Sequence, residues 1–270
     1  MTRQPLWMLI ILTFACMTHA AAQDESETLK LGVFPYVNTG KLIKHQAVLH
    51  QFLRRQLNKD IDFVTAPDFK GYADRVRNRE YDLIYVPPHL ARYCEQRGLY
   101  TPLALTQTKI QGVYIVNKKS SYYRLQDLKG KNISLSTVAS RLSLLRQLLD
   151  SQVDSLAINK LNIIEAKTHN NSIFSLLKKD VDVTLTGVKI WQDLKPEAKS
   201  QLRKIGSTAE TPGFVIMARP ALARQIKPLF THVDKDFSAA LAGKKYLFRG
   251  LKAYQENMLN GMDAYTKPFE

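Results

Sequence analysis

Short apolar runs with the composition of β-strands alternate with longer segments of helical periodicity along most of this chain. An apolar run at 29–35 precedes a segment at 40–57 in which leucines recur at helical spacing, and a second apolar run follows at 61–65. A strand, a helix and a further strand in this order fold into a right-handed βαβ unit, which predicts a mainly parallel sheet covered by helices. The predicted fold class is therefore α/β.

The same alternation continues to the C-terminus and predicts more than one such unit. Hydrophobic residues make up 45% of the 270 residues and charged residues 23%, which is enough to bury a core and excludes a disordered chain. Two αβ lobes are expected: lobe 1 from 29–117 and 209–270, where the chain returns to it, and lobe 2 from 118–208. Further strands are expected at 82–86, 110–117, 132–136, 161–166, 181–186 and 214–218, and further helices at 69–79, 89–96, 139–149, 171–179, 220–241 and 250–259.

The N-terminal residues have the order of a secretory signal peptide. Arg3 precedes a short apolar run at 6–15, and small residues at 18–22 precede the polar segment 23–27. The apolar run is too short to span a bilayer, and the small residues fit a cleavage site. We therefore expect residues 1–22 to be removed on export.

The cysteines and histidines limit the chemistry that the chain can perform. Cys16 lies in the segment expected to be removed, and the residues before it match a lipobox poorly, so Cys94 is left as a single, buried thiol without an intrachain disulfide. The six histidines are scattered, and no nucleophile elbow, zinc-protease, Walker A or dinucleotide-binding motif is found. We therefore expect no catalytic residues, no metal site and no cofactor.

A formal charge of +15 leaves three classes of partner open, namely nucleic acid, an anionic membrane surface and an anionic solute. The basic residues are dispersed, and the densest groups are pairs such as those at 54–55 and 244–245. Export argues against a nucleic-acid partner. A basic surface that is simply solvated is the remaining alternative, so the charge alone does not decide the function.

Three junctions between an expected strand and an expected helix are candidates for an anion site. They lie at 36–40, 136–141 and 168–172, each after the C-terminal end of a strand, where ligands bind open α/β sheets. A helix N-terminus offers unpaired backbone N–H groups to an anion, although Ser, Thr and Asn at such positions also act as plain helix caps. Three junctions on two lobes favour an anion between them.

Several segments together resemble one known family. The chain is similar, in order and spacing from about residue 29 to 230, to the phosphate/phosphite/phosphonate-type periplasmic solute-binding proteins of ABC transporters. The resemblance implies the type II periplasmic binding fold, in which two αβ lobes joined by a two-strand hinge close on an anion. It also implies a periplasmic monomer. The segments that carry it are LGVFPY at 31–36, YDLIYVPPHLARY at 81–93, TPLAL at 101–105, GVYIVNKKSSYYRLQDLKGKNISLS at 112–136 and THNNSIFSLLKKDVDVTLTG at 168–187.

Family members hold the phosphoryl oxygens with a Ser-Thr-Ser-Gly turn that opens a helix of the second lobe. The matching position here reads Ala139-Ser140-Arg141-Leu142, so only the central hydroxyl is retained. The Arg141 guanidinium either binds the anion with two parallel hydrogen bonds or points to solvent. The ligand-binding residues expected from the junctions and the resemblance are Tyr36, Tyr85, His89, Thr137, Ser140, Arg141 and His169.

Each of the aromatic candidates has a structural alternative. Tyr36 and Tyr85 follow strand ends in lobe 1 and could equally pack in the core. His89 opens a helix after two prolines, and His169 matches a family histidine but could serve as a helix cap. Iron-binding relatives of this fold use adjacent tyrosines as ligands, but here the pair at 122–123 is expected to pack on the surface.

The predicted function is capture of a small oxyanion, of the phosphate, phosphite or phosphonate class, for an inner-membrane ABC permease. The alternative on the same fold is a periplasmic ligand-sensing partner of a membrane receptor, such as a sensor kinase or cyclase. No carboxylate is in place to bind a ligand amine, which argues against an aminophosphonate.

Overall fold

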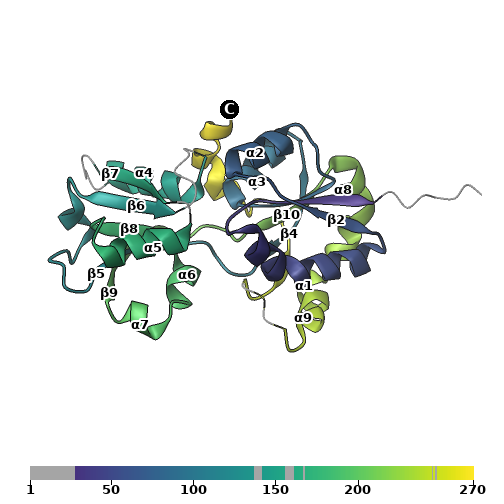
Figure 1. The fold of residues 1–270 in the computed structure, drawn as a ribbon. Coiled ribbons are helices and arrows are strands. Elements are labelled where there is room, and N and C mark those ends of the chain that lie inside the picture. Colours follow the sequence, from purple (N-terminus) through teal and green to yellow (C-terminus); the bar gives the residue numbers. More distant parts are fainter. Residues whose placement is uncertain (1–27, 137–141, 156–160, 167, 245, 247) are drawn as a thin grey trace, which may run out of the picture.

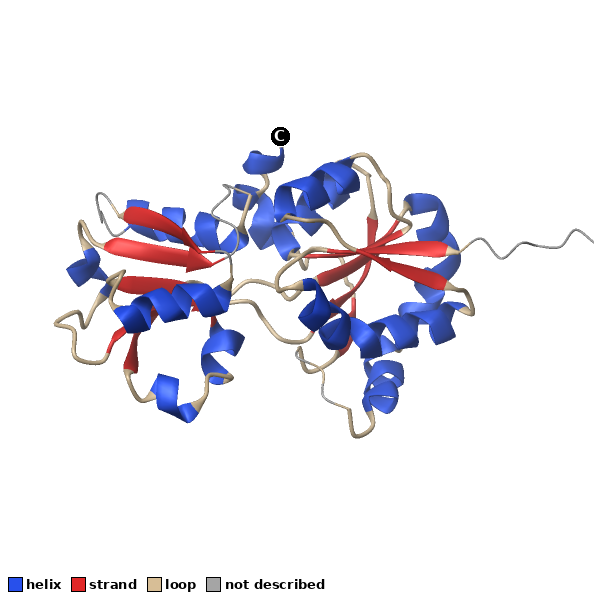
Figure 2. Cartoon of the chain, in the orientation of Figure 1, coloured by secondary structure: helices blue, strands red, loops and turns tan. Residues whose placement is uncertain are grey.

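The computed structural model describes residues 28–136, 142–155, 161–166, 168–244, 246 and 248–270. The chain forms two lobes that lie side by side and are joined by two connecting segments (Figure 1). The strands of each lobe form one sheet with helices packed against it (Figure 2). The expected signal peptide lies outside the described residues. None of the helices in the described ranges is long and apolar enough to cross a bilayer.

Lobe 1 is built on a six-stranded sheet in the order β11-β4-β10-β3-β1-β2. Strands β1, β2 and β3 pair in parallel, as the βαβ pattern predicts, while β10, β4 and β11 pair antiparallel. β1 and β3 are short and mostly buried, so they read in the sequence as apolar runs, whereas β2 lies at the edge of the sheet and carries the exposed Asp62. The strands of lobe 1 are β1 (Leu29–Val33), β2 (Ile61–Val64), β3 (Leu83–Val86), β4 (Thr101–Thr106), β10 (Val215–Ala218) and β11 (Leu251–Ala253).

The helices of lobe 1 begin and end at recognisable signals. The Asn38 side chain accepts a 3.0 Å hydrogen bond from the Lys41 amide and so caps the first helix, which stops at Asn58 in the left-handed conformation. Leu42, Leu49 and Leu53 form its buried face, as the leucine spacing predicts. The helices are α1 (Thr39–Leu57), α2 (Phe69–Arg77), α3 (Pro88–Gln96), α8 (Pro220–Ile226), the 3-10 turn η2 (Lys227–Phe230) and α9 (Val233–Leu241).

Lobe 2 is built on a five-stranded sheet in the order β7-β6-β8-β5-β9. β6 pairs in parallel with β7 and β8, and β5 pairs antiparallel with β8 and β9. Tyr114 and Val116 of β5 pack into one core cluster and Val113 and Ile115 into another, so the strand is covered on both faces. The elements are β5 (Gly112–Asn117), η1 (Leu125–Leu128), β6 (Asn132–Ser136), α4 (Leu144–Ser155), β7 (Asn162–Ala166), α5 (His169–Lys178), β8 (Val183–Gly187), α6 (Val188–Gln192), α7 (Pro196–Lys199) and β9 (Leu202–Ser207).

The first connection between the lobes lies earlier than the sequence pattern predicted. The expected boundary followed residue 117, but β5 pairs with β8 and β9, so the first crossover spans 107–111. The second crossover spans 208–214, and the two are joined by backbone hydrogen bonds between Ile110 and Thr211 of 3.1 and 2.8 Å. An apolar run identifies a buried strand but not the sheet that it joins, which explains the error.

Besides β11, the strands β4 and β9 of the observed sheets were not predicted. β4 contains Pro102, which reads as a break, but the proline sits at a register shift between β4 and β10 where no ladder hydrogen bond is needed. β9 is an edge strand with polar residues, so it lacks an apolar signal. Neither strand was visible from hydrophobic pattern alone.

The C-terminal segment also differs from expectation. The helix predicted at 250–259 is wrong, because β11 occupies 251–253 and extends the sheet of lobe 1 beside β4. Two 3-10 turns, η3 (Asn260–Tyr265) and η4 (Lys267–Phe269), then run between the lobes beside α2 and α3 (Figure 1). A 2.6 Å contact from Arg92 to Asp263 and the buried ring of Phe269 hold this end of the chain against lobe 1.

Candidate ligand-binding site between the lobes

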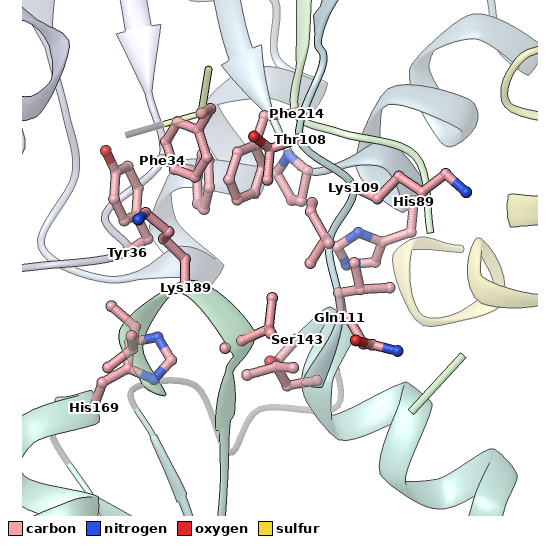
Figure 3. A pocket seen from close by; sticks show the side chains of 18 of the residues that line it. Phe34, Tyr36, His89, Thr108, Lys109, Gln111, Ser143, His169, Lys189 and Phe214 are labelled. Carbon is pink, nitrogen blue, oxygen red and sulfur yellow. The ribbon is translucent and has the colours of Figure 1, made fainter. Parts of the chain in front are cut away.

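A pocket of about 150 Å³ lies between the lobes, beside both crossovers. Figure 3 shows the labelled residues of lobe 1 on one side of it and those of lobe 2 on the other. A cavity of this volume holds a molecule of about the size of benzene. Lobe 1, the first crossover and lobe 2 all contribute lining residues. They are Phe34, Pro35, Tyr36, Phe69, Pro87, His89, Phe214 and Phe248 from lobe 1, residues 108–111 from the first crossover, and Ser143, Leu144, Leu145, His169 and 187–190 from lobe 2.

Four aromatic side chains, which we call the aromatic floor, form the lobe 1 side of the pocket. They are Phe34 and Tyr36 after β1, Phe214 before β10 and Phe248 before β11. Their rings pack in a continuous chain, with centroids 5.0 Å apart for Phe34 and Tyr36, 4.9 Å for Phe34 and Phe214, and 4.8 Å for Phe214 and Phe248. Rings that support one another in this way hold a fixed apolar surface.

Tyr36 and Tyr85, both expected to bind ligand, have different positions. Tyr36 lines the pocket, and its hydroxyl oxygen accepts a 2.9 Å hydrogen bond from Gln46 of α1. Burial raises the pKa of Tyr36, so the phenol keeps its proton for donation at neutral pH. Tyr85 is fully buried on β3 behind Phe34 and Phe214 and is not among the described lining residues, so it packs in the core.

His89 lies at the first turn of α3 and has no exposed surface. Its Nε2 donates a 2.7 Å hydrogen bond to the carbonyl oxygen of Leu142, which belongs to lobe 2. The ring lies between Phe69 and Phe269, with centroids 6.0 and 5.1 Å away. Burial lowers the pKa of His89 to about 4, against a smaller raising effect of the bond to Leu142. The histidine is therefore neutral at pH 7 and links the two lobes.

His169 is the first residue of α5 and lines the lobe 2 side of the pocket. Its Nδ1 shares a 2.7 Å hydrogen bond with the buried hydroxyl of Thr186 on β8, which fixes the orientation of the ring. Burial lowers the pKa of His169, which keeps it neutral at pH 7. The capping role falls to Thr168, whose hydroxyl accepts a hydrogen bond from the Asn171 amide at 3.1 Å. The imidazole therefore lines the pocket and does not act as the helix cap.

The junction expected at 136–141 in lobe 2 differs from the prediction. The helix expected from residue 139 begins at Leu144, and residues 142 and 143 are not helical. Thr137, Ser140 and Arg141 lie outside the described residues. Ser143, directly before α4, lines the pocket in this region, and its carbonyl oxygen accepts from the Gln147 amide at 3.0 Å. The first turn of α4 therefore adjoins the pocket.

Charge and hydrogen-bonding groups at the pocket favour an anion. The described lining residues include Lys109 and Lys189 but no Asp or Glu. Each lysine also contacts a carboxylate outside the pocket, at 2.9 Å from Glu210 and Asp193 respectively. The Thr108 hydroxyl is buried and has no hydrogen-bond partner among the described residues, so a ligand atom could satisfy it.

Sequence reasoning missed several of these residues. Phe34 lies within LGVFPY, where it was taken as part of the strand, and Phe214 and Phe248 precede short strands. Ser143 and Lys189 had no distinguishing motif. Phe34, Ser143, Phe214 and Phe248 each lie just before or after a helix or strand, and Lys189 lies in the first turn of α6. That these positions face one pocket is visible only once the sheets are known.

The remaining candidates lie away from the pocket. Tyr122 donates to Asp182 at 3.0 Å, and Tyr123 lies under the Arg203 guanidinium at 4.1 Å, so the surface packing predicted for this pair is confirmed. Cys94 is fully buried, as predicted, and burial raises the pKa of its thiol. Within the described ranges, no three His, Cys, Asp or Glu side chains gather in a way that could hold a metal ion.

Comparisons with known proteins agree with this architecture. The family model described as "ABC transporter, phosphonate, periplasmic substrate-binding protein" matches residues 31–255. Among solved structures, XAC2383 of Xanthomonas citri bound to ATP is 18% identical, with a TM-score of 0.72 over 90% of this chain and 97% of that one. PhnD1 of Prochlorococcus marinus with methylphosphonate is 14% identical, with a TM-score of 0.70 over 90% and 98%. A binding component of a Pseudomonas aeruginosa phosphonate transporter is 17% identical, with a TM-score of 0.68 over 89% and 86%.

Proposed function

Because the chain belongs to the family of periplasmic substrate-binding proteins of phosphonate ABC transporters, we propose that its interlobe pocket captures a small phosphorus oxyanion for an inner-membrane permease. Proteins of this family bind a substrate for transport and do not transform it. The proposal concerns the particular ligand, of the phosphate, phosphite or phosphonate class, and the residues that bind it.

The observation that carries this proposal is the composition of the pocket. It lies where the two lobes meet, the first turns of α4 and α5 adjoin it, and no acidic side chain is among its described lining residues. Unpaired N–H groups at helix N-termini stabilise an oxyanion. The hydroxyls of Ser143 and Thr108 and the imidazole of His169 are the side chains placed to donate to it, with Ser140 and Arg141 as further candidates outside the described residues.

Capture would proceed by closure of the lobes. A ligand that contacts both lobes stabilises the closed arrangement by as much as its affinity for the two arrangements differs. The paired crossovers at Ile110 and Thr211 supply a connection of two strands about which the lobes can turn. Tyr36 on one lobe and His169 on the other are then brought to the same ligand.

A thermal-shift panel on the ligand-stripped mature protein tests the proposal. Phosphate, phosphite, methylphosphonate, sulfate and several carboxylates are compared, and a ligand at about 100 times its Kd raises the free energy of unfolding by about 2.7 kcal/mol. A selective response to a phosphorus oxyanion supports the proposal. Equal responses to sulfate and carboxylates, or none to any phosphorus oxyanion, would overturn it.

A receptor-partner role is the second candidate on the same pocket. The departure from Ser-Thr-Ser-Gly at 139–142 favours it, because a sensor can tolerate weaker ligand binding than an importer. Copurification from the periplasm with a tagged permease, or with a sensor kinase or cyclase, separates the two roles.

N-terminal sequencing of the protein purified from the periplasm tests whether residues 1–22 are removed. The elution volume of the same protein in size-exclusion chromatography tests whether it is a monomer.

A further inference from the structure

We propose that the ligand is an organophosphonate whose carbon substituent is a short, uncharged alkyl group packed against the aromatic floor. This inference rests on the proposed function, because it describes the ligand of the same pocket. It adds that the pocket prefers such a substituent to bare phosphate and to a substituent that carries an amine.

The aromatic floor is built to receive an apolar group. Phe34 and Phe248 are each 7% exposed and are supported from behind by Tyr85 and Tyr246, so the rings cannot withdraw from the pocket. Figure 3 shows Phe34, Tyr36 and Phe214 across the pocket from His169 and Ser143. An oxyanion held by lobe 2 would therefore direct its substituent toward the floor.

Bare phosphate fits this arrangement poorly. Phosphate presents oxygens in every direction, and any oxygen that faces buried aromatic carbon loses its hydration without gaining a hydrogen bond. A phosphonate has three oxygens on one side and carbon on the other, so its carbon can pack on the rings while its oxygens reach the polar groups of Ser143, His169 and Thr108. The aromatic floor therefore favours a ligand that presents carbon to it.

An ammonium group on the substituent is disfavoured by charge. Lys109 and Lys189 line the same pocket, and the described lining residues offer no carboxylate. The nearby Glu210 and Asp193 are already paired with those lysines. Aromatic rings can attract a cation, but no carboxylate among the described lining residues could pair with it, so the buried ammonium would lack a counter-ion.

Isothermal titration with a graded series tests this inference. The series is phosphate, methylphosphonate, ethylphosphonate and propylphosphonate, with 2-aminoethylphosphonate as the charged counterpart of propylphosphonate. We expect affinity to rise about fourfold for each buried methylene. Propylphosphonate should bind at least tenfold more tightly than 2-aminoethylphosphonate.

A substitution in the floor links the trend to these residues. In Phe214→Leu the rise in affinity with chain length should be flattened, while methylphosphonate, held mainly by lobe 2, should change less than threefold. Phe174→Leu is the matched control, because Phe174 on α5 is an exposed phenylalanine that does not line the pocket. Thermal melting of both variants without ligand shows whether each one folds.

The outcomes separate this inference from the proposed function. Phosphate that binds as tightly as propylphosphonate, or 2-aminoethylphosphonate that binds more tightly, would overturn the apolar substituent while the oxyanion site stands. An unchanged trend in Phe214→Leu would also overturn it. If no member of the series binds, the proposed function itself fails and the inference fails with it.

Discussion

His89 and Leu142 join the two lobes through a 2.7 Å hydrogen bond from the imidazole Nε2 to the backbone carbonyl oxygen. The Leu142 side chain, although it belongs to lobe 2, packs against the hydrophobic core of lobe 1. Polar and apolar contacts thus coincide at one point beside the pocket. We infer that this pair stabilises the closed arrangement in which a ligand contacts both lobes.

Replacement of His89 by leucine should therefore weaken ligand binding by about fivefold. A neutral hydrogen bond is worth about 1 kcal/mol, and here it would be lost from the closed form alone. Isothermal titration gives the affinity, and small-angle X-ray scattering with and without ligand gives the degree of closure.

The control for this variant is His50→Leu. His50 Nε2 also contacts a backbone carbonyl oxygen at 2.7 Å, that of Ile61, but both residues belong to lobe 1. His50→Leu should lower stability without changing affinity. Equal loss of affinity in the two variants would show that the bond to Leu142 has no special role in closure.

Acid should destabilise the protein partly through His89. Burial lowers the pKa of His89 from 6.5 to about 4, so between these values the unfolded chain binds a proton that the folded protein does not. The stabilising contribution is complete above pH 6.5 and is lost as the pH falls toward 4, by at most about 1.4 kcal/mol per pH unit. Urea unfolding at pH 7, 6 and 5 should show a shallower fall for His89→Leu than for the wild type, and parallel profiles would contradict this account.

Thr186 should matter for binding through His169. In Thr186→Val the hydrogen bond to Nδ1 is lost while the shape of the side chain is retained, so one of the contacts that orient the His169 ring is removed. Ligand affinity should fall by about five- to tenfold and unfolding free energy by about 1 kcal/mol. Thr65→Val, which removes a 2.8 Å bond to the Val33 carbonyl oxygen away from the pocket, should lower stability alone. If both variants bind normally, the orientation of His169 is not set by Thr186.

Gly213 is required at the end of the second crossover. A Cβ atom at this position would overlap with the carbonyl oxygen of Thr106 on β4, which cannot yield without moving the strand. Gly213→Ala should lower the free energy of unfolding by about 1–3 kcal/mol. Gly261→Ala, where nothing lies within 4 Å, is the control and should change it by less than about 0.5 kcal/mol. Equal melting temperatures for the two variants would show that the crossover can rearrange.

The predictions from sequence succeeded where a local signal is strong. The leucines of α1 and the Asn38 cap predict that helix nearly to its ends, and the apolar runs locate β1, β3, β6 and β8. They failed where the decisive contact is distant. β4 carries a proline that only the register with β10 accommodates, and β11 has three residues that become a strand only beside β4.

The candidate site was predicted in the same uneven way. Tyr36 and His169 lie where a predicted strand ends and a predicted helix begins. Both could therefore be proposed from the order of strands and helices along the chain. Tyr85 could not be assigned, because the face of a central strand that a side chain occupies depends on what covers the sheet. The partner of His89 was equally inaccessible, since Leu142 lies 53 residues away on another lobe.

The sequence by itself determined the α/β class, the two lobes and the family, because periodicity, caps and motifs are local properties of the chain. Only the tertiary structure decided that β5 belongs to lobe 2, that four aromatic rings from three distant segments form one floor, and that His89 bonds to Leu142 of the other lobe. Those features depend on which surfaces pack together. Which surfaces pack together depends on the burial of apolar side chains over the whole chain and not on any single segment.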